Sequence, residues 1–117
     1  MDLASKLQLK PGQRVEGVSV PDSVASVLPM AKGEAGDDQV ALLIFVVDRT
    51  ALAGLQARIV DAAGRDRLTW VAYPKSGQLG TDLNRDSLAA ILTAGGARPV
   101  RQVAIDDVWS ALRFRPG

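Results

Sequence analysis

The chain has 117 residues, with 14 basic and 13 acidic side chains that leave a net charge of +1, and it contains neither cysteine nor histidine. This composition excludes disulfides, zinc sites built on thiolate or imidazole, and nucleophile systems of the Cys-His or Ser-His-Asp kind. We expect one domain over 1–117, with no metal, no cofactor and no nucleic-acid partner, because the charge balance gives no general attraction for phosphate backbones.

The first predicted elements are short. Residues 2–9 predict a brief helix with Asp2 as its cap, and residues 14–20 alternate apolar and polar side chains as a strand does. Residues 24–28 predict another short helix. The glycine-rich stretch 30–38 that follows predicts a loop with room for a short, weak strand.

The most strongly predicted strand is Val40–Val47, which is continuously apolar and rich in β-branched residues. Such a run is typical of a central parallel strand that is buried on both faces. Asp48 or Thr50 is suited to cap the helix that follows, and Gly64 stands where a left-handed residue would end that helix. Residues 65–67 read as a polar connector.

The last third of the chain predicts a strand over 68–72, a helix capped by Asn84, and two strands over 100–105 and 108–114 joined by a turn at 106–107. The resulting fold class is α/β. We expect a three-layer Rossmann-like sandwich: a mostly parallel sheet of about five strands, helices on both faces, and an antiparallel C-terminal strand pair.

The connection after the strand 68–72 is the candidate ligand site. In open α/β sheets ligands lie beyond the carboxyl ends of the parallel strands, and a helix N-terminus attracts anions. A small anion would find several polar groups there, and the candidate residues are Tyr73, Lys75, Ser76, Asp82, Asn84 and Arg85. The alternative is structural: Asn84 caps the helix, and Asp82 pairs with Arg85 or Lys75.

The last strands carry a candidate interaction patch, which consists of Arg101, Trp109 and Arg113. Arginine can pair with a partner's carboxylates, and tryptophan often anchors interfaces. The alternative is that the arginines protect an edge strand from aggregation and that Trp109 packs in the core.

The segments WVAYPK, TDLNRD and VRQVAID-VWSALRFRP, with the opening KPGQRV, resemble a bacterial family known as domain of unknown function 3052. This resemblance implies a Rossmann-like fold and no particular activity. The order of elements is also similar to a shortened class I methyltransferase. The chain departs from that fold after its first strand, where Pro21, Asp22 and Ser23 replace the closely spaced glycines of the cofactor loop.

The sequence is compatible with two functions. The favoured one is a non-catalytic binding module, which takes a small anion at the 73–85 loop or pairs with another protein or with itself as a homodimer. The other is a degenerate methyltransferase-like enzyme that uses S-adenosylmethionine, with Asp48, Tyr73 and Lys75 as its polar groups. The first ten residues lack the apolar segment of a signal peptide, so we expect a cytoplasmic protein without membrane contact.

Overall fold

The computed structural model describes residues 1–32 and 37–117, so part of the predicted loop 30–38 lies outside the described residues. Within these ranges no helix combines the length and the apolar character that crossing a bilayer would need. The elements, in chain order, are α1 (Leu3–Lys6), β1 (Val15–Val18), α2 (Asp22–Ala25), β2 (Ala41–Phe45), α3 (Arg49–Gly64), β3 (Thr69–Pro74), η1 (Gln78–Gly80), α4 (Arg85–Ala94), β4 (Ala97–Ala104) and β5 (Trp109–Pro116).

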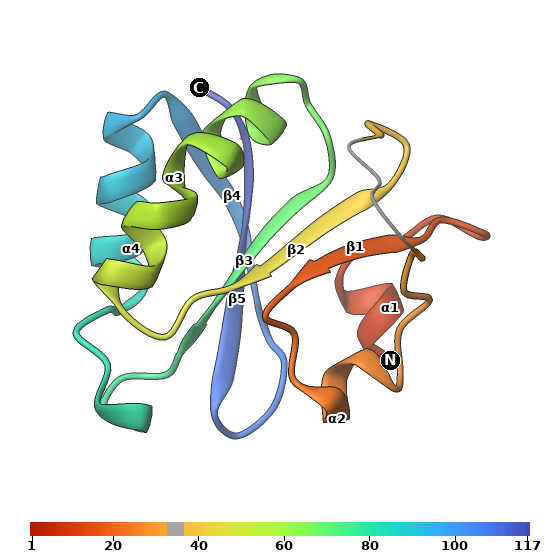
Figure 1. Cartoon of the computed structure of the whole chain (residues 1–117), viewed down its shortest axis with the longest axis horizontal. Helices are drawn as coiled ribbons and strands as arrows, with labels where there is room; N and C mark the ends of the chain where they lie inside the picture. Colours follow the sequence, from red (N-terminus) through yellow and green to blue (C-terminus); the bar gives the residue numbers. More distant parts are fainter. Residues whose placement is uncertain (33–36) are drawn as a thin grey trace.

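The five strands form one mixed sheet in the order β1-β2-β3-β5-β4 (Figure 1). β1, β2 and β3 are parallel, whereas β5 is antiparallel to both of its neighbours. The predicted antiparallel C-terminal pair is therefore confirmed. The expectation of a mostly parallel sheet is not, because β5 turns back between β3 and β4 and makes two of the four pairings antiparallel.

Helices cover both faces of the sheet, with α3 and α4 on one side and α1 and α2 on the other (Figure 1). β2 serves both layers because successive side chains of a strand point to opposite faces. Leu42 and Ile44 pack in the cluster that contains the side chains of α3 and α4. Leu43 and Phe45 pack in the cluster on the α1 and α2 side. The prediction of a strand buried on both faces is confirmed.

A single parallel bridge joins Val15 to Met30 on the far side of β1. The Val15 amide donates to the carbonyl of Pro29, and the Val15 carbonyl accepts from the amide of Ala31. The short strand expected in the loop 30–38 is thus one bridge among the described residues. The chain runs from β1 outward to Met30 and then back past β1 to β2, so a topological switch point lies between β1 and β2.

The starts of α3 and α4 follow the sequence closely, whereas α2 begins two residues before its predicted start and the end of α3 also differs. Asp48 caps α3 by accepting from the Ala51 amide at 2.9 Å, and Asn84 caps α4. The prediction for Gly64 is wrong, since Gly64 lies within α3 and Asp66 takes the left-handed turn, with a φ of 57°. Aspartate tolerates this conformation better than most residues with a side chain.

The β4 strand begins three residues before its predicted start and includes Pro99. Proline cannot donate a hydrogen bond to a sheet, so it is confined to edges and bulges. Both conditions hold here, because β4 is the edge strand and its register with β5 shifts between Pro99 and Arg101.

A buried arginine links β1, β2 and the chain that enters β3. The Arg67 side chain is only 3% exposed, and its guanidinium donates at 2.6 Å both to a carboxylate oxygen of Glu16 and to the carbonyl of Val40. Arg58, on α3, also pairs with Glu16. Residue 67 was expected in a polar connector, but it is part of the interior.

Candidate functional site

The polar groups of the predicted ligand loop contact the protein itself. The Asp82 carboxylate accepts from the Arg49 amide at 2.9 Å, and the Asp82 carbonyl accepts from Arg49 Nε at 3.1 Å. Asn84 and Ser87 bond each other reciprocally at the start of α4. These contacts, together with the Asp48 cap, occupy amide donors at the first turns of α3 and α4, where an anion would otherwise bind.

The other candidate residues lie in different surroundings, and Tyr73 is a buried residue of β3, which extends past its predicted end at residue 72. The Tyr73 hydroxyl accepts from Gln102 Nε2 at 3.0 Å. Burial raises the pKa of this phenol, with the Arg85 cation acting in the opposite direction, so Tyr73 stays protonated at neutral pH. The Lys75 amide donates to the Val108 carbonyl at 2.7 Å, which extends the pairing of β3 with the last hairpin. Ser76 is exposed in the turn that follows.

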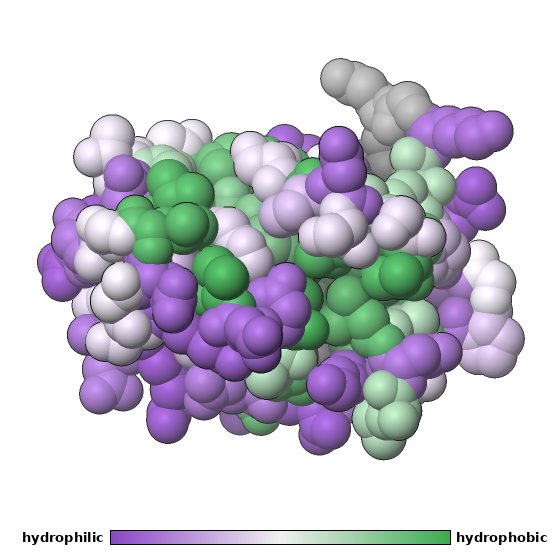
Figure 2. Space-filling model, turned by 90° about the horizontal axis from the view of Figure 1, so that it is seen from below, coloured by the Kyte–Doolittle hydropathy of each residue, from purple (hydrophilic) through white to green (hydrophobic). Residues whose placement is uncertain are grey.

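Apolar side chains close over the end of β1, next to the switch point. A Cβ placed on Gly17 would lie 2.6 Å from both Met30 Cε and Val20 Cγ2, so any larger residue would require these two side chains to shift. Figure 2 shows the molecule from below, the side on which α2 and the turn between β4 and β5 lie in Figure 1. Apolar side chains form separate groups among hydrophilic ones on this side.

The residues of the predicted interaction patch differ in their exposure to solvent. Trp109 is only 9% exposed, and its ring packs edge-on against Phe45 with the centroids 4.8 Å apart and the planes at 68°. Arg101 and Arg113 are partners across β4 and β5. Arg101 is exposed, whereas Arg113 is partly buried beside α1.

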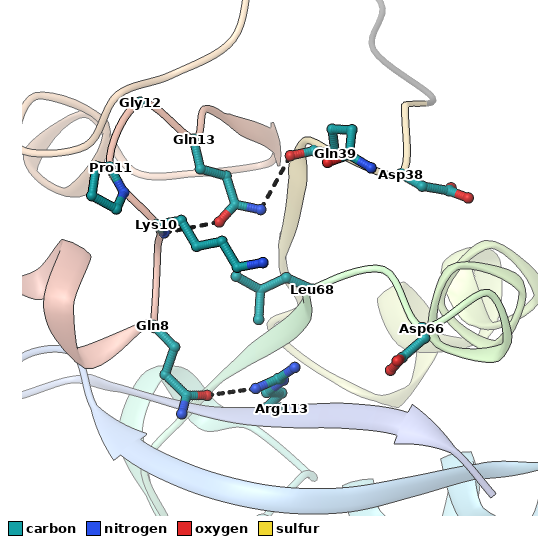
Figure 3. Close-up of a pocket in the computed structure, with 10 residues that line it drawn as sticks. All are labelled: Gln8, Lys10, Pro11, Gly12, Gln13, Asp38, Gln39, Asp66, Leu68 and Arg113. Carbon is teal, nitrogen blue, oxygen red and sulfur yellow. Dashed lines mark hydrogen bonds between the residues drawn. The ribbon is translucent and has the colours of Figure 1, made fainter.

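A polar cavity of about 560 Å³ lies at the opposite end of the sheet, where the parallel strands begin. We call it the amino-edge cavity. In Figure 3 the Lys10 side chain extends into it above Leu68, and Arg113 and Gln8 lie together on the strand side. The residues that line it are Gln8, Lys10, Pro11, Gly12, Gln13, Asp38, Gln39, Asp66, Leu68 and Arg113.

The Arg113 guanidinium has unused hydrogen-bonding capacity at this cavity. One Nη donates to the Gln8 side-chain carbonyl at 2.8 Å, but the buried Nε has no hydrogen-bond partner among the described residues. Burial lowers the pKa of Arg113, and the nearby Arg115 and Arg101 cations lower it further, against the opposite effect of Asp66. Arg113 therefore makes no direct ion pair among the described residues, and the more distant Asp66 offsets its charge only in part.

Charge is unbalanced in the amino-edge cavity because its two carboxylates are already paired. Asp66 receives two hydrogen bonds from Arg115, at 3.0 and 3.1 Å, and Asp38 pairs with Arg65 at 3.1 Å. Neither Lys10 nor Arg113 has a carboxylate within 4.0 Å among residues 1–32 and 37–117. Two cations thus face a space large enough for a small organic molecule.

The Asp66–Arg115 pair gives a pH-dependent signal at the rim of this cavity. The hydrogen bonds from Arg115 hold the pKa of Asp66 below its ordinary value, so the pair stabilises the fold above that ordinary pKa and is lost as the pH falls through the depressed one. In Arg115→Gln, NMR titration of the Asp66 carboxyl is expected to show a higher pKa than in the parent protein. An unchanged pKa would contradict the pairing.

Sequence analysis singled out Arg113 as part of an interaction patch, but it did not predict the amino-edge cavity, because the lining residues come from distant segments of the chain. Gln8, Lys10, Asp66 and Arg113 meet only through the sheet. One signal was available in the sequence. Trp109, Ala111 and Arg113 lie on the same face of β5, and a cation in an otherwise apolar row indicates a side chain that is at least partly buried.

The residues that line the cavity determine the chemistry it can offer. Its cations can orient an anion, but the cavity holds neither a histidine nor a cysteine to carry a nucleophilic or proton-transfer step near neutral pH. Among the described residues no group of three acidic side chains is placed to hold a metal ion. Comparison of the chain with models of protein families, with curated proteins and with solved structures finds no match to any of them.

Proposed function

We propose that this protein is a non-catalytic binding module that holds a small molecule by its phosphate or carboxylate group in the amino-edge cavity. The observation that carries the proposal is the partly buried Arg113, which lines the cavity and makes no ion pair with a carboxylate of the described residues. An oxyanion there would accept from the terminal guanidinium nitrogens of Arg113 and from Lys10, and would place negative charge beside both cations.

The carboxyl end of the sheet is the weaker place for this ligand. Its helix N-termini are capped by Asp48, Asp82 and Asn84, so an anion would have to displace hydrogen bonds that are already made. A ligand gains least where its partners are already satisfied. Tyr73, Lys75 and Arg85 therefore contribute less to the proposed binding than the cations of the amino-edge cavity.

We further propose that the domain is a shortened Rossmann-like fold without its cofactor turn. The switch point between β1 and β2 supports the Rossmann-like assignment, since the chain leaves β1 in one direction and returns in the other. The packing of Val20 and Met30 onto Gly17 speaks against the alternative, a methyltransferase-like enzyme, because these side chains occupy the place where a backbone would have to approach S-adenosylmethionine.

Replacing Lys10 by glutamine is expected to weaken anion binding roughly three- to tenfold, because one of two cationic partners is lost at an accessible site. Isothermal titration calorimetry with inorganic phosphate, citrate and adenosine monophosphate measures the effect. Lys75→Gln is the matched control, since it removes the same charge at the other end of the sheet.

The two variants also separate the two candidate sites. If the anion binds at the 73–85 loop, Lys75→Gln weakens binding and Lys10→Gln does not. If S-adenosylhomocysteine binds and the three anions do not, the methyltransferase-like alternative gains support and the proposal fails.

A further inference from the structure

A groove of about 350 Å³ lies between α4 and the edge strand β4. We call it the α4–β4 groove. Its apolar part comes from Ala89, Pro99, Val100 and Leu112, and its polar part from Arg85, Arg101 and Gln102. Val100 is 39% exposed where the register of β4 shifts, so an apolar side chain is presented to solvent beside two cations.

The cations around this groove make no ion pairs among the described residues, although Asp86 follows Arg85 in the first turn of α4. No carboxylate of residues 1–32 or 37–117 lies within 4.0 Å of the guanidinium groups of Arg85, Arg98 or Arg101. Arg98 reaches only the Pro116 carbonyl, at 3.4 Å. Asp106 and Asp107 are close in sequence, but Asp106 accepts instead from the amides of Val108 and Trp109 in the hairpin turn.

The groove also lies beside backbone that no other strand covers. β4 is the last strand of the sheet, so its outer edge can receive an extended segment. A second copy of this chain pairing antiparallel along β4 would bring Arg98 and Arg101 of the two copies together, and like charges across a strand pair are destabilising. A segment with acidic side chains would meet the same arginines favourably.

We propose that the α4–β4 groove binds an extended acidic segment of a partner protein that alternates carboxylate and apolar side chains. The carboxylates pair with Arg85 and Arg101, which line the groove, and with Arg98 farther along the edge of β4, and an apolar side chain packs on the exposed Val100. Nucleic acid fits less well, because the groove offers no aromatic side chain on which a base could stack. This surface shares no lining residue with the amino-edge cavity, and the proposal does not depend on the function proposed for that cavity.

Fluorescence anisotropy with a labelled peptide of alternating glutamate and leucine tests the proposal. Arg85→Gln/Arg101→Gln is expected to weaken binding of this peptide about tenfold, with a steep loss as salt is raised. Val100→Ser is expected to weaken it by a smaller factor. Arg14→Gln, which removes an exposed arginine elsewhere, and Lys10→Gln, which alters the amino-edge cavity, should leave the affinity unchanged.

Several results would overturn the proposal. One is an absence of binding to this peptide, and another is a loss of affinity in Arg14→Gln as large as that in Arg85→Gln/Arg101→Gln. A third is equal affinity for a polyglutamate peptide of the same charge, which would show attraction to net charge alone. Tighter binding of an oligonucleotide than of the peptide would also overturn it. Backbone NMR shifts confined to α4 and β4 on adding the peptide would support it.

Discussion

Replacing Glu16 by alanine is expected to destabilise the protein by about 3–5 kcal/mol, because the substitution leaves the buried Arg67 cation without its carboxylate. The Arg67 side chain is 3% exposed and cannot turn to water without opening the sheet beside β1. Its remaining bond, to the Val40 carbonyl, satisfies one donor but supplies no full negative charge. The free energy of unfolding from urea denaturation measures the loss.

A second variant distinguishes the effect of an unpaired buried charge from a general loss of packing. In Glu16→Ala/Arg67→Met the buried cation is removed together with its partner, so part of the lost stability should return. Asp61→Ala is the control, since it breaks an ion pair between largely exposed side chains and is expected to cost less than about 1 kcal/mol. If the double variant is less stable than Glu16→Ala alone, the unpaired Arg67 charge does not explain the loss of stability in Glu16→Ala.

The elements that local chemistry dictates were predictable from the sequence. The apolar run Val40–Val47 required a strand with cover on both faces, and Asp48 and Asn84 could be identified as helix caps by residue type and position. The end of α3 was not predictable in this way. Gly64 suited a left-handed turn intrinsically, but the turn lies at Asp66, where the carboxylate also gains hydrogen bonds from Arg115 on β5.

Contacts between distant segments limited the prediction of the candidate site in the same way. Arg85 and Arg101 belonged to two separate predicted sets, and the structure brings them to one groove because β4 follows α4 back along the sheet edge. Arg113, by contrast, was grouped with Trp109 and Arg101, yet its contact is with Gln8, more than one hundred residues away in the chain. Sequence spacing cannot show such a contact before the sheet order is known.

The second large effect is expected at Trp70, whose indole holds α1 against the sheet. Its Nε1 donates to the Leu7 carbonyl at 2.9 Å, and Trp70 is only 1% exposed. Replacing it by phenylalanine leaves this carbonyl without its donor and removes part of a buried ring, so we expect a loss of about 2–4 kcal/mol. Trp109→Phe is the matched control, because no described residue accepts a hydrogen bond from the Trp109 indole, and we expect a smaller loss there.

The Trp70→Phe substitution should also weaken ligand binding in the amino-edge cavity. A helix of four residues is not stable alone, so α1 depends on tertiary contacts, among which are the burial of Leu7 and the bond from Trp70. Gln8 and Lys10 follow directly and line the cavity. Hydrogen exchange should show faster exchange of the Leu7 and Leu9 amides, and calorimetry weaker phosphate binding, in Trp70→Phe than in Trp109→Phe. Equal exchange and equal affinity in the two variants would show that α1 is positioned without this hydrogen bond.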